Sequence, residues 1–368
     1  MDNPLLLIML GLFQKMPSIK IKSKVENYSI HIQSGIFYDL LLKNEFVLLD
    51  SVFRERFSVG EAKVIWVDAK EDEKNLQTCE QVLKQMKNLG MTRQSNLLAV
   101  GGGFVQDIAT LTSSLFMRGI KWTYVPTTLM SMLDSCVGGK SSINVDGAKN
   151  LVGNIYPPKD IYVDSNFASD LSEMAVASGL CEAIKICFAA GPAYYEKFIE
   201  IQKGCLQFDS PEGEKLVEHV LSCKKIFVEK DEFDQRERQL LNFGHTFGHA
   251  LESAMGFEIA HGVAIGLGII AALEFQEHEL NQIQTSLRSS VLKILEPVLL
   301  DITKLCKQFN PQLFLEAFKK DKKHTPTLFR LILCDNDGLK IVEIGRTAEN
   351  LENVLRAMTT ALDKCSNL

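Results

Sequence analysis

The stretch Leu97-Leu-Ala-Val-Gly-Gly-Gly-Phe-Val-Gln-Asp107 indicates the fold of the first half of the chain. A short apolar run ends in three consecutive glycines, and Asp107 follows four residues after the last of them. Glycines directly after a strand let the backbone approach a pyrophosphate, and the N–H groups of the next helical turn stabilise its charge. The triplet by itself is also compatible with a simple tight turn, because it is not the complete GxGxxG fingerprint.

Short apolar or β-branched runs surround this stretch on both sides. They are separated by charged segments with helical character, of which residues 75–89 are an example. This alternation predicts a parallel sheet covered by helices, with the first two runs paired as neighbouring strands. The predicted strands lie at residues 19–25, 28–32, 46–49, 64–67, 97–100, 122–125 and 161–163.

Helical periodicity dominates from about Leu171 to Leu362. One exception is predicted, a hairpin of residues 328–334 and 339–342 joined by Asn-Asp-Gly. We therefore expect two domains, which meet between Asp164 and Leu171. Residues 1–170 form a Rossmann-like α/β domain that binds a nucleotide, and residues 171–368 form a mainly helical domain that binds metal and substrate.

Other polar residues at predicted strand ends add to the nucleotide prediction. Asp50 closes one strand, where a carboxylate can accept hydrogen bonds from ribose hydroxyls, although a helix N-cap is the more ordinary use of such a residue. Thr127 and Thr128 follow another strand and offer two hydroxyls at the edge of the sheet where α/β proteins bind ligands. Their joint placement favours a nucleotide site.

A histidine-rich motif stands in the helical half. Leu241-Asn-Phe-Gly-His-Thr-Phe-Gly-His249 is followed by His261-Gly262, so three of the seven histidines fall within seventeen residues. The spacing of His245 and His249 places both on one face of a helix. Imidazoles gathered without nearby cysteine suit a catalytic divalent cation such as zinc. The alternative is a helix with two satisfied core histidines.

Cationic, amide and carboxylate side chains are dense within otherwise apolar sequence. Lys140 and Lys149 lie beside glycine-rich or apolar segments, where a solvated face is unnatural, so we expect them to be buried against an anionic partner such as a substrate phosphate or carboxylate. Glu182 and Lys185 are three residues apart on a predicted helix. The other members of the set are Arg118, Asp134, Asn150, Lys224, Arg238, Asn242, Asp321, Lys322 and Lys323.

Composition sets limits on partners and compartment. The chain has 368 residues, of which 46% are hydrophobic, and a formal net charge of −6, which gives no general attraction to nucleic acid or anionic membrane. Its nine cysteines contain no CxxC pair, which indicates reduced thiols in a cytoplasmic protein. The apolar run of residues 5–13 is too short to span a bilayer and lacks the basic flank of a secretory signal. Met16 is an alternative start, and a packed or flexible arm or a membrane anchor are the other interpretations.

Taken together, these motifs resemble the 3-dehydroquinate synthase family of sugar phosphate cyclases. The resemblance covers about residues 50–323, with the motifs in order and sensibly spaced. The segments that carry it are Val100-Gly-Gly-Gly-Phe-Val-Gln-Asp107, Met117-Arg-Gly119, Val125-Pro-Thr-Thr128, Leu133-Asp-Ser-Cys-Val-Gly-Gly-Lys140, Lys149-Asn150, Gly179-Leu-Cys-Glu-Ala-Ile-Lys185, Leu241–His249 and His261-Gly262.

The resemblance implies a lyase that converts 3-deoxy-D-arabino-heptulosonate 7-phosphate to 3-dehydroquinate and phosphate. Such an enzyme uses NAD that is reduced and then restored, together with zinc or cobalt. Hydride removal creates a ketone that acidifies the neighbouring C–H, so phosphate is eliminated before the hydride returns and an aldol step closes the carbocycle. Closure of the two domains over the cleft is expected, because an oxidised intermediate must not escape.

The resemblance also assigns roles to residues. By position, Glu182, His245 and His261 match the metal ligands, and His249 matches an active-site histidine beside them. Arg118 matches a phosphate-binding arginine that crosses the interface of a homodimer. The remaining catalytic or substrate-site matches are Asp134, Lys140, Lys149, Asn150, Lys185, Lys224, Arg238, Asn242 and either Lys322 or Lys323. The NAD contacts match Asp50, Glu71, Lys74, Gly101, Gly102, Gly103, Asp107, Thr127 and Thr128, with Lys140 and Lys149 shared between cofactor and substrate.

Three places depart from the usual family pattern. Gln106 stands where glycine is usual before Asp107, residues 170–175 lack a common adenosine-contacting segment, and residues 144–148 replace a loop that usually contains His and Pro. Other functions compatible with the sequence are a sister cyclase that forms an inosose, valienol-type or amino-dehydroquinate product, and a metal-dependent polyol or glycerol phosphate dehydrogenase. A catalytically silent NAD-binding scaffold is a further alternative, which the intact set of ligand residues argues against.

Overall fold

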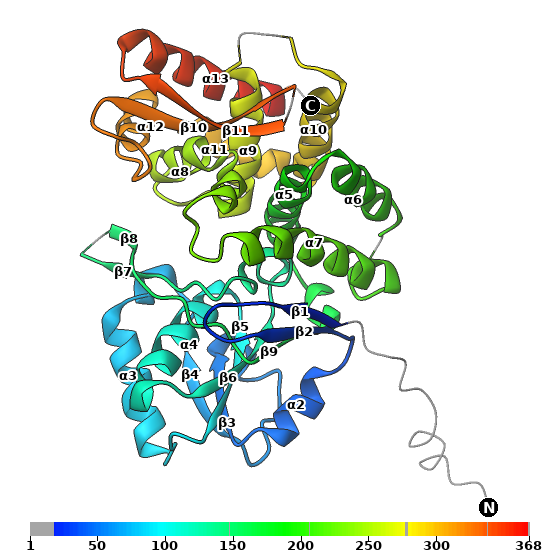
Figure 1. The fold of residues 1–368 in the computed structure, drawn as a ribbon, viewed down its shortest axis with the longest axis vertical. Helices are drawn as coiled ribbons and strands as arrows, with labels where there is room; N and C mark the ends of the chain where they lie inside the picture. Colours follow the sequence, from blue (N-terminus) through cyan, green and yellow to red (C-terminus); the bar gives the residue numbers. More distant parts are fainter. Residues whose placement is uncertain (1–17, 147, 206, 277–278, 337, 367–368) are drawn as a thin grey trace, which may run out of the picture.

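The computed structural model describes residues 18–366, apart from 147, 206, 277–278 and 337. Two halves follow one another along the chain, a sheet-containing half and a helical half that carries the C-terminus (Figure 1). The apolar run of residues 5–13 and Met16 lie outside the described residues, so the predictions about them stay untested. In the described part of the chain, no helix is both long enough and apolar enough to cross a bilayer.

The first half is built on a seven-stranded sheet in the order β1-β2-β9-β6-β5-β3-β4. Only β1 and β2 pair antiparallel, and every other neighbouring pair in this sheet is parallel. All seven predicted strands are present, and the two at the N-terminus are paired as expected. The strands are β1 (Ser18–Ile21), β2 (Tyr28–Ile32), β3 (Phe46–Asp50), β4 (Lys63–Val67), β5 (Asn96–Gly101), β6 (Lys121–Pro126) and β9 (Asp160–Val163).

The central strands are buried on both faces. Residues 47–49 of β3 and 97–100 of β5 have no exposed surface, which explains why both read as continuous apolar runs rather than alternating ones. Helices α2 (Phe37–Lys43), α3 (Leu76–Asn88) and α4 (Gly103–Leu115) belong to this half. Helix α4 packs on β5 and β6, so its N-terminus is fixed at the carboxyl end of β5, where the three glycines stand.

Two local features in residues 131–152 were not predicted from the sequence. Residues Ser131–Ser135 form a π-helical turn directly after β6. Strands β7 (Ile143–Val145) and β8 (Ala148–Val152) form a separate antiparallel hairpin, drawn in Figure 1 as an arm beside the junction of the two halves. Its strands have only three and five residues, and most of these residues are half-buried or exposed, so they do not form the buried apolar run that marks the strands of the large sheet.

The second half is mainly helical, as predicted. Its hairpin of β10 (Leu328–Asp335) and β11 (Gly338–Gly345) lies where the sequence placed it. Helix α9 is buried on almost every side, which accounts for the absence of a polar face in its sequence. The helices are α5 (Glu173–Ala190), α6 (Pro192–Gly204), α7 (Pro211–Lys230), α8 (His245–Ala254), α9 (His261–Glu274), α10 (Gln282–Leu295), α11 (Leu299–Cys306), α12 (Pro311–Lys319) and α13 (Ala348–Ser366).

Helix α7 joins the halves. It packs on β1 and β2, and Glu229 at its end accepts a hydrogen bond from the backbone N–H of Lys22 at 2.7 Å. Just beyond the helix, Glu232 accepts one from the N–H of Lys24 at 2.7 Å. Figure 1 shows α7 lying directly over this pair of strands. The N-terminal strand pair therefore anchors the helical half to the sheet.

Candidate active site

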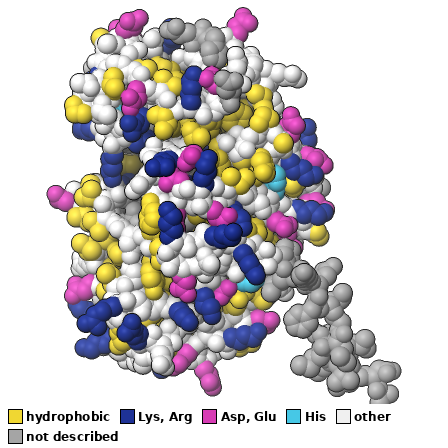
Figure 2. Space-filling view, in the orientation of Figure 1, with side chains coloured by type: hydrophobic (Ala, Val, Ile, Leu, Met, Phe, Trp, Pro, Cys, Tyr) yellow, Lys and Arg dark blue, Asp and Glu magenta, His cyan; other side chains and the backbone are white. Residues whose placement is uncertain are grey.

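One cavity of about 310 Å³ lies between the two halves. Lys and Arg side chains are numerous across the middle of the face shown in Figure 2, at the level where the halves meet. The sheet half and its hairpin arm line the cavity with Lys74, Gly103, Gln106, Asp107, Asp134, Ser135, Val137, Lys140, Ser141, Ser142 and Asn150. The helical half contributes Lys185, Lys224, Asp234, Arg238, Leu241, Asn242 and His245.

The glycine turn presents an open backbone surface to this cavity. A Cβ placed on Gly103, the first residue of α4, would meet nothing closer than Ser135 Oγ at 4.0 Å. A Cβ on Gly101 would instead lie 2.3 Å from a methyl carbon of Val105, so that glycine is needed for the turn to close. The free N–H groups of a helix start, with space in front of them, are suited to a pyrophosphate.

Gln106 fills the space that a glycine would leave. Its side chain is buried, donates a hydrogen bond to the carbonyl of Ser135 at 2.7 Å, and accepts one from the Ser135 hydroxyl at 2.7 Å. These two bonds tie the first turn of α4 to the π-helical turn that carries Asp134. The departure from the family pattern at this position therefore has a structural role of its own.

Asp107 and Lys74 form the centre of a polar network at the cofactor side of the cavity. Lys74 Nζ lies 3.1 Å from Asp107 Oδ2 and donates to Asn150 Oδ1 at 2.9 Å. Asp107 Oδ1 accepts from the Ser142 N–H at 3.1 Å. Burial raises the pKa of Asp107 to about 6, although Lys74 opposes the shift. The network attaches the hairpin arm to α4 and fixes Asn150, whose φ of 52° lies in the left-handed region.

The other predicted cofactor residues are spread along the sheet edge. Asp50 caps the turn that follows β3 by accepting from the Val52 N–H at 3.2 Å, which is the ordinary role considered for it. Thr127 is buried, and the Thr128 hydroxyl is 2.8 Å from that of Ser131. Glu71 accepts a hydrogen bond from Asn144 Nδ2 at 2.9 Å. None of these four residues lines the 310 Å³ cavity itself.

Two buried lysines from the helical half reach the cavity with carboxylate partners. Lys224 Nζ lies 2.6 Å from Asp134 Oδ1 and also donates to the Asp134 carbonyl. Burial acts to raise the pKa of Asp134, but the charges of Lys224 and Lys185 outweigh it and hold that pKa below its usual value. Burial lowers the pKa of Lys224 despite this pairing. Lys185 is paired in the same way with Glu182 on its own helix.

Arg238 is a different kind of cation. It is buried, and its guanidinium donates to the backbone carbonyl of Glu232 at 2.6 Å. Among the described residues no carboxylate forms an ion pair with it, so a buried positive charge faces the cavity with donors to spare. Gly138, with φ of +110°, makes room for it, because a Cβ there would lie 2.0 Å from Arg238 Nη2.

The structure corrects the burial expected for Lys140 and Lys149. Lys140 is 42% exposed along its side chain, with Nζ 2.6 Å from Asp234 Oδ2, and its partial burial together with the charge of Arg238 lowers its pKa. Lys149 is 34% exposed and lies over the Phe257 ring at 3.6 Å. The buried lysines are Lys74, Lys185 and Lys224 instead, whereas Lys140 stands on a loop that lines the cavity and Lys149 stands on the hairpin arm outside it.

Glu182, His245 and His261 converge on one point. Glu182 Oε1 lies 3.6 Å from His245 Nε2 and 3.3 Å from His261 Nε2. This oxygen is fully buried and makes no hydrogen bond of acceptable geometry with any described residue, while Oε2 is taken by Lys185. A buried carboxylate oxygen left in this state, with two imidazole nitrogens facing it, fits a divalent cation.

The contacts around this group set the protonation of its two histidines. Burial and the nearby Lys185 hold the pKa of His245 well below its usual value, so its ring is neutral, as a metal ligand must be. Burial acts against the proton on His261, but the two carboxylates that face its ring, Glu182 and Glu252, outweigh burial and raise its pKa to about 10. His261 therefore holds a proton between two carboxylates, at a position for which a divalent cation competes.

Close packing of helices brings these ligands together. A Cβ on Gly262 would lie 1.9 Å from the carbonyl oxygen of Ser178, so α9 touches α5 backbone to backbone at this point. The N–H of Gly262 donates to Ser178 Oγ at 2.9 Å. This contact places His261 at the start of α9 against Glu182, which is one helical turn along α5 from Ser178.

Of three further predicted residues, His249 and Lys323 lie near His245, whereas Lys322 lies against the hairpin arm. His249 is exposed, and its ring centre is 5.1 Å from that of His245 and 5.5 Å from that of His261, close enough to offer a nitrogen to the same cation. Lys323 is near enough to act on the pKa values of His245 and His249. Lys322 instead donates to the carbonyls of Lys149 and Asn150 at 3.3 and 3.2 Å. The two lysines that the sequence left unresolved thus have different positions.

Arg118 is not brought into the cavity. It is exposed, and both Met117 and Arg118 have left-handed backbone conformations, with φ of 49° and 67°. The turn is closed by a hydrogen bond from the Gly119 N–H to the Phe116 carbonyl at 2.9 Å. Arg118 therefore does not line the 310 Å³ cavity of its own chain.

Two residues were missed. Glu252 Oε2 lies 3.0 Å from His261 Nδ1 and so orients the ring of a proposed ligand. Its spacing carried a signal, because His245, His249 and Glu252 follow one another at helical intervals on one face of α8. Asp234, the partner of Lys140, stands in an irregular loop with φ of 58° and gave no such signal.

Comparison with known proteins agrees with this geometry. Residues 64–178 match the profile described as 3-dehydroquinate synthase N-terminal, and residues 179–324 match the profile described as 3-dehydroquinate synthase C-terminal. The 3-dehydroquinate synthase of Dictyoglomus turgidum is 33% identical over 349 residues, which cover 89% of this chain and 95% of that protein. That of Clostridium tetani is 30% identical over 349 residues, with 94% and 90% covered.

Solved structures show the same fold. A 2-epi-5-epi-valiolone synthase from Streptomyces hygroscopicus has a TM-score of 0.76 at 19% identity, and 94% of this chain and 99% of that chain are covered. A 2-deoxy-scyllo-inosose synthase has a TM-score of 0.74 at 20% identity, with the same coverage. With two profiles that together span most of its length, the chain belongs to the 3-dehydroquinate synthase family.

Proposed function

We propose that this protein converts 3-deoxy-D-arabino-heptulosonate 7-phosphate to 3-dehydroquinate and phosphate, as an enzyme that depends on NAD and a divalent metal. The proposal rests mainly on one observation. A single cavity is lined both by the glycine turn at the start of α4 and by the cations next to the Glu182, His245 and His261 group. The place that would hold a hydride acceptor and the residues that would hold a divalent cation therefore adjoin.

Both non-protein groups have residues that fit them. Glu182, His245 and His261 would hold zinc or cobalt, because an unsatisfied buried carboxylate oxygen and two imidazoles form a suitable donor set. The open turn at Gly103 would hold NAD together with four residues at the edge of the sheet, which are Asp50, Glu71, Thr127 and Thr128. When bound, the metal polarises a substrate hydroxyl and NAD accepts and later returns a hydride. A cyclase structure of this fold contains NAD⁺ and Co²⁺.

The cations of the cavity would bind the two anionic ends of the substrate. Arg238 has donors free for a carboxylate or phosphate, since only a carbonyl of this chain uses its guanidinium among the described contacts. Lys140 and Lys224 stand beside it, each held by one carboxylate. Fixed cations stabilise the charge that develops on a departing phosphate without having to reorganise.

Other residues of the cavity orient the carboxylate of Glu182 and hold the two halves together. Lys185 occupies Glu182 Oε2, which leaves Oε1 as the atom directed at the two imidazoles. Asn150 and Lys74 hold the hairpin arm at the cavity, and Lys322 ties that arm to the helical half through two backbone carbonyls. We infer that this tie keeps the halves closed over the oxidised intermediate, which excludes water from it.

We further propose a cytoplasmic homodimer in which Arg118 completes the neighbouring subunit's phosphate site. The exposed, strained position of Arg118 outside its own cavity supports this assignment. All nine cysteines are free thiols, which supports a reducing compartment. A mixture of Arg118→Ala with an active-site variant tests the dimer, because shared sites would restore activity that neither variant has alone.

The proposed reaction is tested with purified protein, NAD and either Zn²⁺ or Co²⁺. The expected result is release of phosphate and formation of 3-dehydroquinate from the seven-carbon keto-acid sugar phosphate, with no net accumulation of NADH. Phosphate release only from a sugar phosphate that lacks the carboxylate would replace the proposal with a sister cyclase. Net NADH formation would replace it with a polyol or glycerol phosphate dehydrogenase.

A further inference from the structure

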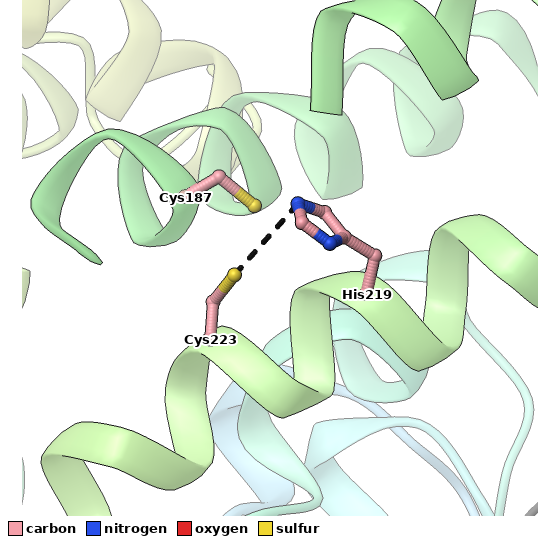
Figure 3. A group of neighbouring side chains, drawn as sticks. All are labelled: Cys187, His219 and Cys223. Atoms are coloured by element: carbon pink, nitrogen blue, oxygen red, sulfur yellow. Dashed lines mark hydrogen bonds between the residues drawn. The ribbon is translucent and has the colours of Figure 1, made fainter. Parts of the chain in front are cut away.

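A second group of metal-ligating side chains lies away from the proposed active site. Cys187 of α5 and His219 and Cys223 of α7 point toward one another across the interface of the two helices (Figure 3). One ligand atom from each residue lies within 4.8 Å of the other two. The residues of α7 are four apart, so they share one face of that helix, and this face packs on α5.

We infer that Cys187, His219 and Cys223 form a binding site for a thiophilic divalent cation, with zinc the metal that best fits it. In a tetrahedral zinc site, ligand distances of about 2.3 Å to sulfur and 2.0–2.1 Å to nitrogen place a sulfur and a nitrogen about 3.6 Å apart. Cys223 Sγ and His219 Nε2 are 3.8 Å apart. The pair is therefore already close to the separation that a shared cation requires.

The surroundings of the cluster suit a metal better than an ordinary buried thiol pair. Both sulfurs are buried, whereas His219 is half-buried and gives solvent a path to the group. Two thiolates and a neutral imidazole around Zn²⁺ carry no net charge, which removes the cost of burying a charge.

The imidazole must change one contact to bind the cation. His219 Nε2 lies 2.8 Å from the backbone carbonyl of Tyr194, to which it donates when that nitrogen carries the proton. On metal binding the ring proton moves to Nδ1, and Nε2 becomes a ligand. The Tyr194 oxygen, already beside this nitrogen, or a water molecule completes the four-coordinate set.

A cation here would clamp two helices that carry active-site residues. Helix α5 holds Glu182 and Lys185, and Lys224 directly follows Cys223 on α7. The site would therefore fix the distance between the carboxylate of the catalytic metal group and the lysine that pairs with Asp134. Its role would be structural, because none of its three members lines the 310 Å³ cavity.

Cobalt substitution distinguishes the two sites, since only the second contains sulfur. The full-length protein, stripped of metal under reducing conditions, is titrated with Co²⁺ while its near-ultraviolet absorption is recorded. We expect a thiolate-to-cobalt charge-transfer band that stops growing when the sulfur site of each chain is filled and that disappears when Zn²⁺ is added. The band should persist in His261→Ala, which damages only the proposed catalytic group, so failure of one site is separable from failure of the other.

Variants then assign the band. Cys187→Ser and Cys223→Ser should lose it, and His219→Ala, at a half-buried position that tolerates truncation, should lose tight binding while remaining folded. Cys365→Ser is the matched control, because Cys365 is equally buried in another helix and should leave the band unchanged. Absence of the band in the folded parent protein, its survival in both cysteine variants, or a Cys187–Cys223 disulfide that persists in reductant would overturn the inference.

Discussion

The glycine turn at the start of α4 and the ligand group on α5, α8 and α9 adjoin the same cavity but are built in different ways. At the turn, Gly103 offers backbone N–H groups and empty space. At the ligand group, Glu182, His245 and His261 offer side-chain atoms that depend on the packing of three helices. The glycine turn can bind a ligand because its residues have no side chains in the way, whereas the ligand group depends on the carboxylate and imidazole atoms of its side chains.

This difference teaches where tolerance to substitution lies. Truncation of a ligand side chain in the helical half should abolish metal binding and activity while the protein stays folded. The helices α5 and α9 would still pack through the backbone contact at Gly262, which the truncation does not touch. An added side chain in the glycine turn should alter binding or folding according to the space around each glycine. The following predictions test that contrast, beginning with the largest effect.

His261→Ala should abolish activity while the protein stays folded. The lost ligand removes a metal contribution worth several kcal/mol of charge stabilisation, which corresponds to a rate loss of about 10³-fold or more. Metal content by elemental analysis and far-ultraviolet circular dichroism, measured together, check the result. Activity that survives in metal-free buffer would show that Glu182, His245 and His261 are not the ligands of a catalytic metal.

Arg238→Ala should lower kcat/KM by about 10–100-fold, because a charge-assisted hydrogen bond to a buried anion is worth about 1.5–3 kcal/mol. Arg238→Lys is the matched variant, since it keeps the charge and loses the planar fork. Steady-state kinetics with the keto-acid sugar phosphate separate the two. If Arg238→Ala has normal kinetics, the unpaired guanidinium is structural and the substrate anion binds elsewhere.

The contrast within the glycine turn is testable with two alanines. Gly103→Ala, with no atom nearer than 4.0 Å to the new Cβ, should leave the melting temperature unchanged and weaken NAD binding by about tenfold, since the methyl group occupies the phosphate cradle. Gly101→Ala, which meets Val105 at 2.3 Å, should cost about 1–3 kcal/mol of stability. Calorimetry of NAD binding and thermal unfolding measure both, and equal effects in the two variants would contradict the distinction.

Asp107 adds a pH dependence in the sheet half. Its pKa is about 6 in the folded protein against 3.8 for the unperturbed group, so the folded state holds the proton more tightly. The resulting stabilisation is complete below the unfolded value and is lost as pH rises through about 6. Relative to Asp107→Asn, the cofactor-free parent should lose about 1–3 kcal/mol of unfolding free energy between pH 4 and 7. Urea unfolding at both pH values checks this, and a constant difference between the proteins would refute it.

Much of the fold was readable from local sequence. Every strand of the large sheet, the helical character after Leu171 and the β10–β11 hairpin follow from periodicity and turn residues. The hairpin arm at residues 143–152 and the π-helical turn before it did not, because both are held by contacts with distant residues such as Lys74, Gln106 and Lys322. Local propensity has no access to such contacts.

The candidate site divides in the same way. The glycine triplet directly follows a short apolar run, and the face shared by His245 and His249 follows from the period of a helix, so the sequence determines both features by itself. The resemblance had grouped Glu182 with His245 and His261, but only the tertiary structure shows how closely Glu182 approaches His261. Only the tertiary structure decided that Lys140 has a carboxylate partner while Arg238 has none among the described residues, and that Cys187 faces His219 and Cys223. Those pairings join separate elements, and the physical reason is packing: the depth to which α9 settles on α5 and α7 on α5 is set by side-chain volumes on all surfaces at once, which no short stretch of sequence contains.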